Sequence, residues 1–245
     1  MLPVKPFTQA KSRLTAWRGA SRTQLAHAFF RDTLEAVLET TGIGRVLVVT
    51  GDDQAAAEAR CIGAVTVPDH PPAGLNAAIS TAAAHAHAVG ARGPIAVLTC
   101  DLPALRSAEL VQVLASAGEH PRAVLADHTG QGTTLLAAAR PQWLAPSFEG
   151  HSRHRHRLGG AHDITGVDVS SVQLDVDTPD DLRLAVRLGV GQHTRAVLAP
   201  APGPSRSLPP SSSRPPPRSL ARVVLQQACG ARGGAVFRGR WWRRG

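Results

Sequence analysis

The sequence predicts an α/β fold in which a mostly parallel β-sheet is covered by helices on both faces. Short apolar runs alternate along the chain with segments of helical periodicity. Several runs are continuously apolar, such as VLVVT at 46–50 and PIAVLT at 94–99, which is typical of strands buried on both faces. With 43% hydrophobic residues in 245, the chain is long enough for one sizeable core.

An apolar run at 1–4 predicts the first strand, and a helix follows a polar loop. Ser21 is placed to cap this helix and Gly42 to end it. Further strands are predicted at 46–50, 64–67, 94–99, 123–126, 134–138 and 172–176. Further helices are predicted at 53–60, 76–88, 108–117 and 179–188. Because ligands of such folds bind beyond the carboxyl ends of the strands, the chemistry is expected there.

The net charge of +9 belongs to the C-terminal segment. Residues 201–245 hold nine arginines and no acid, whereas the rest of the chain is neutral. The body therefore carries no net basic field for nucleic acid. The segment begins with Pro, Ser and Arg, a composition that cannot bury enough apolar area to fold. We expect a folded domain over 1–199 and a disordered tail over 200–245. The tail is either an extension without a function or a segment that binds RNA through FRGRWWRRG.

The remaining composition indicates a cytoplasmic protein. No apolar run approaches the roughly 20 residues that span a bilayer, so no membrane contact is expected. The start of the chain has no secretion signal pattern. The three cysteines have neither metal-ligand spacing nor a disulfide framework, which fits a reducing compartment.

Both lysines of the chain, Lys5 and Lys11, fall within seven residues. Elsewhere the chain uses arginine for positive charge. The clustering indicates two sites that need a compact ammonium group.

Two acidic motifs follow predicted strands. Asp101 is the first charged residue after the run at 94–99, and Pro103 and Ser107 are better placed than Asp101 to start the next helix. In DVDTPDD, period-two alternation puts Asp175 and Asp177 on one face of a strand end, a pair suited to Mg²⁺. A helix cap accounts for residues 178–181 but leaves those two carboxylates without a structural role. Three carboxylates on two strand ends suit metal-assisted phosphoryl chemistry.

Two further segments carry weaker signals. In the GQGT segment at 130–133, the glycines fit either a backbone cradle for an anion or a hairpin turn. The segment 148–157 interleaves histidines with arginines, which argues against zinc and favours an anionic substrate nearby.

Together the motifs resemble the 2-phospho-L-lactate/phosphoenolpyruvate guanylyltransferase family of deazaflavin coenzyme biosynthesis. The resemblance covers about residues 1–198 and depends on their order and spacing. The motifs are VKP at 4–6, AKSRL at 10–14, GLNAAI at 74–79, DLPAL at 101–105, GQGT at 130–133, 148–152 with RHR at 155–157, and DVDTPDDL at 175–182.

The resemblance implies a single-domain nucleotidyltransferase fold, a glycosyltransferase-A-like three-layer sandwich. It implies GTP binding by Lys5, Lys11 and Arg13 near the triphosphate and by Asn76 near the nucleoside. Lys11, Arg13 and Asp101 would be catalytic, and Asp101, Asp175 and Asp177 would hold Mg²⁺. Thr133, Glu149 and Ser152 would contact the carboxylate of phosphoenolpyruvate. The family has glycine at the position of Glu149.

The implied reaction is attack of the substrate phosphate on the α-phosphorus of GTP, which gives enolpyruvyl-diphospho-guanosine and diphosphate. A downstream transferase of the pathway would receive the product. The motifs do not separate the two acceptors of the family, phosphoenolpyruvate and 2-phospho-L-lactate. The Arg-rich, Lys-poor composition suggests a high-GC actinobacterium, and the bacterial members of the family resemble those that use phosphoenolpyruvate. We therefore favour phosphoenolpyruvate. Two alternatives stay open: a nucleotidyltransferase for a sugar acid or molybdopterin, which the short chain disfavours, and a catalytically silent homologue whose basic tail binds nucleic acid.

Overall fold

The computed structural model describes residues 1–8, 14, 20–69, 73–166 and 168–199. The chain divides into two units, Met1–Ala199 and Pro200–Gly245. The predicted tail, 200–245, lies outside the described residues, and the first unit is described below.

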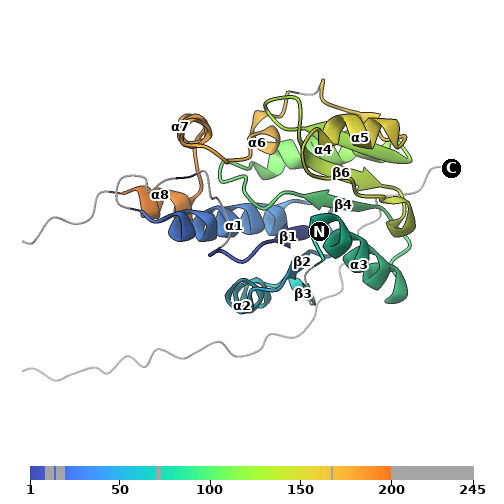
Figure 1. The fold of residues 1–245 in the computed structure, drawn as a ribbon, viewed down its shortest axis with the longest axis horizontal. Helices are drawn as coiled ribbons and strands as arrows, with labels where there is room; N and C mark the ends of the chain where they lie inside the picture. Colours follow the sequence, from blue (N-terminus) through green and yellow to red (C-terminus); the bar gives the residue numbers. More distant parts are fainter. Residues whose placement is uncertain (9–13, 15–19, 70–72, 167, 200–245) are drawn as a thin grey trace, which may run out of the picture. The chain divides into compact units, whose positions relative to one another are not determined.

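Seven short strands form the centre of this unit (Figure 1). They are β1 (Leu2–Val4), β2 (Leu47–Thr50), β3 (Val65–Pro68), β4 (Ile95–Leu98), β5 (Arg122–Ala126), β6 (Thr133–Ala138) and β7 (His162–Asp163). The helices are α1 (Arg22–Glu39), α2 (Asp53–Cys61), α3 (Leu75–Ala88), α4 (Ser107–Gly118), α5 (Ser152–Leu158), α6 (Ser170–Gln173), α7 (Pro179–Leu188) and α8 (Gln192–Leu198), with a 3-10 turn at Pro141–Trp143.

The sheet is mostly parallel, as predicted. β1, β2 and β3 pair in parallel, and β7 is parallel to β5. Among the strands of the described residues, β6 is the one that is reversed, and it pairs antiparallel with β4 and with β5. Met1 joins the two sets of strands, because its ammonium group donates to Ala96 O at 2.5 Å and its carbonyl accepts from Leu98 N at 3.0 Å. This pattern makes β1 a parallel neighbour of β4.

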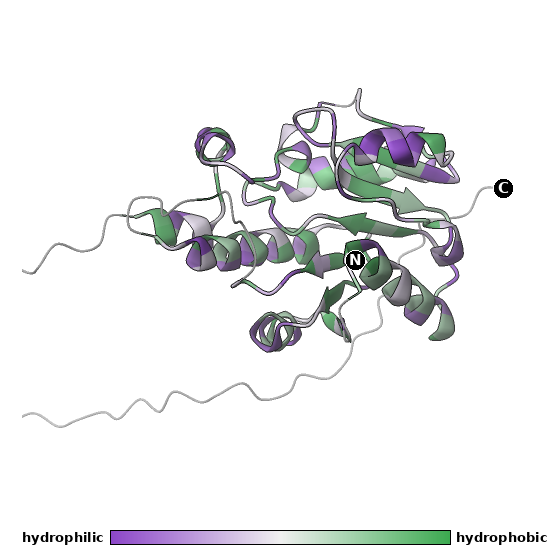
Figure 2. Ribbon diagram, in the orientation of Figure 1, coloured by the Kyte–Doolittle hydropathy of each residue, from purple (hydrophilic) through white to green (hydrophobic). Residues whose placement is uncertain are grey.

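Helices cover both faces of the sheet, so the architecture is a three-layer sandwich. Alternate strand residues separate into different apolar clusters. Val48 packs with residues of α1, α2 and α4, whereas Leu47 and Val49 pack with residues of α3. Figure 2 shows hydrophobic strands in the interior and a strongly hydrophilic α5 on the outside. Alternation along strands buried on both faces therefore produces the two cores.

Local signals determine where the predicted helices begin. Ser21 caps α1 through a capping box with Gln24, as its position in the sequence predicts. Thr178 caps α7 in the same way with Asp181, and Pro179 occupies the first turn. The boundaries of these helices follow from short-range chemistry.

One predicted strand is wrong. Residues 172–176 form the end of the short helix α6 and an extended segment, and the structure assigns no strand there. The apolar residues Val172, Leu174 and Val176 are buried, but against helices and loops. Burial of alternate residues thus does not require a strand partner. The helices α5, α6 and α8 and the two-residue β7 were not predicted from the sequence.

Candidate functional site

Asp101 lies just beyond β4 in a loop that neighbouring elements hold. The Leu102 N–H donates to Thr33 Oγ1 of α1 at 3.0 Å, and this hydroxyl is fully buried with its residue. The Pro103 carbonyl accepts from Gly191 N at 2.8 Å, before α8. The loop is therefore fixed to α1 and to the chain leading into α8, which packs against α1 (Figure 1).

The second acidic motif runs beside this loop. Val176 N–H donates to the Asp101 carbonyl at 3.1 Å. Asp175 and Asp177 therefore flank the residue that is bonded to Asp101, although no strand is present. The Asp177 residue is exposed, and the side chain of Asp175 is 19% exposed. The three predicted carboxylate residues thus come from two segments that lie side by side.

The pKa of Asp175 responds to burial and to the neighbouring carboxylates. Burial raises the pKa of the Asp175 carboxyl most strongly, against a contact with His128 that lowers it. The negative charges of Asp101, Asp177 and Asp127 add to the increase, and the pKa of Asp175 reaches about 6. The arrangement concentrates negative charge where a cation would be stabilised.

His128 is a member of this group that the sequence did not reveal. Its Nδ1 lies 3.6 Å from Asp175 Oδ1, and its Nε2 lies 3.1 Å from Asp181 Oδ1. The contact with Asp175 raises the pKa of His128 most strongly, while burial lowers it and nearby carboxylates raise it. His128 follows β5 without a motif or spacing that marks it, so only the tertiary structure brings it here.

Asp181 orients the acidic segment. Its Oδ2 accepts from the backbone N–H groups of Asp177 at 3.1 Å and Thr178 at 2.7 Å. The capping box that begins α7 therefore also fixes the backbone of Asp177. The carboxylate of Asp181 therefore serves both the cap of α7 and the backbone of a candidate site residue.

The N-terminal basic residues are described only in part. Lys5 is exposed and directly follows β1. Because β1 and β4 are parallel neighbours, Lys5 and Asp101 leave the sheet at the same edge. Lys11 and Arg13 lie outside the described residues. Leu14, the next residue in the chain, is buried in one cluster with Leu174 and Val176.

Thr133 and Ser152 meet as a buried hydroxyl pair. Ser152 Oγ donates to Thr133 Oγ1 at 3.0 Å, and His156 Nδ1 lies 3.1 Å from the same Thr133 oxygen. Thr133 begins β6, and Thr99 N–H donates to the carbonyl of Thr134 at 2.9 Å. Because β6 is antiparallel to β4, the start of β6 lies at the edge where β4 ends, close to Asp101.

The side chain of Asn76 forms two hydrogen bonds with the backbone of Phe148. Its Nδ2 donates to Phe148 O at 3.2 Å, and its Oδ1 accepts from Phe148 N at 2.7 Å. This two-point contact joins the first turn of α3 to the loop that precedes α5. The structure therefore brings Asn76 together with the segment of Glu149 and Ser152.

Glu149 is exposed and has a φ of +84°. Gly150 follows with a φ of +48°. Glycine adopts this left-handed region readily, whereas a side chain with a Cβ is strained there. The backbone at position 149 thus has the conformation that favours the glycine expected from the resemblance.

The GQGT segment forms a hairpin turn between β5 and β6, one of the two alternatives that its sequence allows. Asp127 fills the turn: its Oδ1 accepts from Gln131 N at 3.0 Å, and its carbonyl accepts from Gly130 N at 3.0 Å. A Cβ at Gly132 would lie 2.3 Å from Asp127 Oδ2. Gly132 is therefore required by close packing within the turn.

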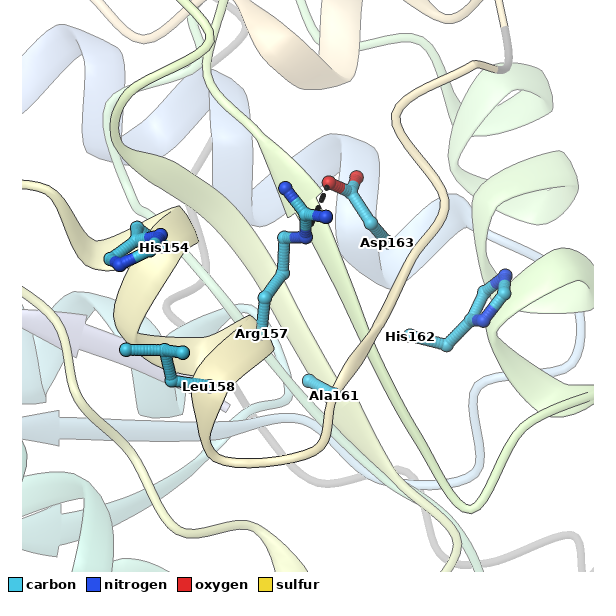
Figure 3. A pocket seen from close by; sticks show the side chains of 6 residues that line it. All are labelled: His154, Arg157, Leu158, Ala161, His162 and Asp163. Atoms are coloured by element: carbon cyan, nitrogen blue, oxygen red, sulfur yellow. Dashed lines mark ion pairs between the residues drawn. The ribbon is translucent and has the colours of Figure 1, made fainter.

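Two surface cavities adjoin α5. One, of about 470 Å³, lies between α5 and β7, where Arg157 pairs with Asp163 (Figure 3). No residue predicted for the site lines it. The other, of about 200 Å³, is lined by Gly130, Gln131, His151, Arg153, His154 and Arg157. No residue predicted for the site lines this cavity either, but it borders the chain neighbours of Ser152 and the turn that leads to Thr133.

Within the described part of the chain, no group of three or more His, Cys, Asp or Glu side chains is arranged to hold a metal ion. The same residues include no helix long and apolar enough to cross a membrane.

The fold and the acidic edge of the sheet define a class of nucleotidyltransferases. The family described as the MobA-like NTP transferase domain matches residues 23–164. Among solved structures, 4-diphosphocytidyl-2C-methyl-D-erythritol synthase shares the fold with a TM-score of 0.53, at 16% identity over 76% of this chain and 98% of that protein.

Relatives with higher sequence identity identify the family within this class. The chain is 48% identical over 204 residues to a phosphoenolpyruvate guanylyltransferase of Streptomyces scabiei, and 49% identical over 201 residues to one of Streptomyces coelicolor. Each alignment covers 81% of this chain and 94% of the relative. The chain belongs to the phosphoenolpyruvate guanylyltransferase family.

Proposed function

We propose that this protein transfers GMP from GTP to the phosphate of phosphoenolpyruvate in the cytoplasm. The observation that carries the proposal is the hydrogen bond from Val176 to Asp101, which sets two acidic segments side by side at the carboxyl end of the sheet in a chain of this family. The relatives aligned over nearly their whole length have names that specify this acceptor.

The reaction needs no covalent enzyme intermediate. An oxygen of the substrate phosphate forms a bond to the α-phosphorus of GTP, while the bond between that phosphorus and the β-phosphate oxygen breaks. The electron pair of the broken bond leaves with diphosphate. A phosphate dianion is already nucleophilic, so the protein contributes positioning and charge neutralisation. The product would pass to a downstream transferase.

Basic residues near the N-terminus are proposed to bind the donor nucleotide. Lys5, Lys11 and Arg13 are proposed to hold the triphosphate, whose negative charge grows on the leaving diphosphate. The exposed position of Lys5 beside the edge of Asp101 supports this role. Leu14 supports it for the neighbouring Arg13, because Leu14 packs with the residues on either side of Asp175.

The chemistry of the donor set at the acidic edge suits a hard divalent cation, although the described side chains are not arranged around one. Carboxylate oxygens are the ligands that Mg²⁺ prefers, and Asp101, Asp175 and Asp177 are proposed to hold it. When bound, such an ion neutralises phosphate charge during phosphoryl transfer. Burial raises the pKa of Asp175 most, and the negative charges of Asp101 and Asp177 raise it further, which supports placing the three carboxylates in one site.

The acceptor is proposed to bind on the side of the hydroxyl pair. Thr133, Ser152 and the backbone at Glu149 would contact the carboxylate of phosphoenolpyruvate. The smaller cavity there is bordered by Arg153, Arg157 and two histidines, which suits an anion. Asn76 is proposed to act near the nucleoside, and its two hydrogen bonds to Phe148 hold the first turn of α3 against the loop before α5.

A coupled diphosphate-release assay with Mg²⁺, GTP and phosphoenolpyruvate tests the proposal. Parallel reactions contain 2-phospho-L-lactate as acceptor, or ATP or CTP as donor. We expect release with GTP and phosphoenolpyruvate alone. Release with 2-phospho-L-lactate in preference would change the acceptor, and no release from folded protein with any pair would reject the proposed function.

Substitution of the carboxylates tests their assignment. Asp101→Asn and Asp175→Asn are expected to abolish turnover because each removes a charged oxygen ligand. Asp175→Asn is not expected to lower the melting temperature, since it relieves repulsion among the carboxylates. Asp168→Asn, on an exposed loop, is the matched control and should retain turnover. Full turnover in both site variants would contradict the metal assignment.

A further inference from the structure

His156 connects three parts of the acceptor side through hydrogen bonds. Its Nε2 lies 2.9 Å from the backbone N of Ser147, in the loop before α5. Its Nδ1 lies 3.1 Å from Thr133 Oγ1 on β6, which also contacts Ser152 Oγ on α5 at 3.0 Å. His156 is 1% exposed, so its ring hydrogen-bonds to these protein groups and not to solvent.

The backbone of Ser147 determines the tautomer of the imidazole. A backbone N–H group can only donate, so Nε2 must carry a lone pair. The ring is neutral because burial, followed by the charges of Arg122 and Arg155, lowers the pKa of His156 to about 4. A neutral ring with a lone pair on Nε2 carries its hydrogen on Nδ1. Nδ1 therefore donates to Thr133 Oγ1.

This direction changes what the hydroxyl pair can do. Thr133 and Ser152 have two hydroxyl hydrogens, and one of them is used in the bond between the two oxygens. If Nδ1 were an acceptor, the second hydrogen would point at His156 and none would be left. Because Nδ1 donates, one hydroxyl hydrogen stays available for a ligand. A carboxylate is an acceptor only, so it requires such a donor.

We propose that His156 is a positioning residue that orients the Thr133 and Ser152 hydroxyls so that the pair donates a hydrogen bond to the carboxylate of the acceptor substrate. This inference rests on the proposed function. It adds a residue whose side chain acts through Thr133 and need not touch the substrate. It also explains why a histidine lies in the buried position of a helix whose other basic residues are exposed or half-buried.

The tautomer can be measured directly in the wild-type protein without substrate. Long-range ¹H–¹⁵N correlation spectra distinguish the Nδ1–H tautomer, the Nε2–H tautomer and the imidazolium ion. We expect the Nδ1–H pattern for His156, assigned by its absence in His156→Phe or His156→Gln. An Nε2–H ring or a charged ring at neutral pH would overturn the inference.

Steady-state kinetics test the consequence. His156→Phe keeps the ring that packs edge-on against Phe148, with centroids 4.9 Å apart, but removes both hydrogen bonds. The KM for phosphoenolpyruvate should rise about tenfold or more, as for loss of one hydrogen bond to a charged group. The KM for GTP should not change. His156→Gln, which retains a donor and an acceptor, should recover part of the loss.

His85→Phe is the matched control, because His85 is an exposed histidine on α3. It should leave both KM values unchanged. Equal changes in the two KM values for His156→Phe, or no change in either, would overturn the role of His156. Wild-type protein that transfers nothing from GTP would instead reject the proposed function, while the tautomer measurement would still test the hydrogen-bond direction.

Discussion

At the scale of single residues, position 149 has a backbone conformation that suits glycine and a side chain that carries negative charge. Its φ of +84° lies in the left-handed region, where a Cβ costs conformational energy. The residue lies two positions after Ser147 and three before Ser152, beside the proposed site of an anionic acceptor. The conformational strain and the electrostatic repulsion both act against this glutamate.

Glu149→Gly is therefore expected to raise both stability and affinity for the acceptor. Relief of the strained φ should increase the free energy of unfolding by about 0.5–1 kcal/mol, since the gain exceeds the extra entropy of an unfolded glycine. The KM for phosphoenolpyruvate should fall because a negative charge is removed. Chemical denaturation and steady-state kinetics measure the two effects. Ala145→Gly, at a φ of +40°, is the matched control and should change stability alone. An unchanged or higher KM for phosphoenolpyruvate in Glu149→Gly would contradict repulsion by this carboxylate.

The buried His156 makes stability depend on pH. Its pKa is about 4 in the folded protein, below the ordinary value of 6.5, so the folded state favours the neutral ring. As the pH falls from about 6.5 to about 4, the unfolded state binds the proton first and folding loses roughly 3 kcal/mol. Denaturation of the wild type and of His156→Gln across this range measures the effect. The variant should lack this part of the loss, and identical pH profiles would contradict it.

At the scale of elements, α7 shows how a local signal contributes to the site. The Thr178 capping box begins the helix, and Asp181 of the same box accepts from the backbone of Asp177. The box is therefore coupled to the acidic segment. A second capping box, of Ser21 and Gln24 at α1, makes the same pair of hydrogen bonds in a different place.

This pair of boxes provides a controlled test. Thr178→Ala and Ser21→Ala should each lower the free energy of unfolding by about 1 kcal/mol, the usual cost of losing a helix cap. Only Thr178→Ala should also lower kcat, because it loosens the segment of Asp175 and Asp177. Thermal denaturation and turnover measurements compare them. Equal kcat values in the two variants would show that the cap does not position the acidic segment.

At the scale of the whole molecule, all described structure belongs to Met1–Ala199. The family match at 23–164 and the elements that hold Asp101, including α8, fall within this range. The net positive charge instead belongs to the segment after it. We therefore propose that folding and transfer are properties of residues 1–199 and that the basic tail is separate from them.

Truncation after Ala199 should leave the melting temperature and kcat/KM unchanged. The alternative role of the tail is tested in the same comparison by RNA binding at low and high salt, since phosphate contacts by arginine weaken as salt increases. Salt-sensitive binding by the full chain alone would assign it to the tail. Loss of folding or turnover on truncation would contradict the proposed domain boundary.

Most elements could be predicted from the sequence, and the sequence also supplied the residues proposed for both halves of the site. Continuous apolar runs identify strands such as β2 and β4 because both faces of the sheet are buried, and short-range caps identify α1 and α7. The resemblance identified residues that the structure groups, such as Thr133 with Ser152. These features are readable because they depend on neighbours in the chain or on motifs.

The remaining members of each group could be found only from the packing of elements that are distant in the chain. The segment before α7 alternates in burial like a strand, yet it packs against helices and loops, which periodicity alone cannot distinguish. His128 carries no signal in the sequence, and the RHR motif that contains His156 does not reveal the hydrogen bonds of its ring, because the partners of both histidines lie on other elements. His128 reaches Asp175 and Asp181 from the β5–β6 turn, and His156 reaches Thr133 across α5 and β6. Contacts between residues distant in the chain depend on how the layers pack, and that packing determines the hydrogen-bond directions on which the proposed chemistry depends.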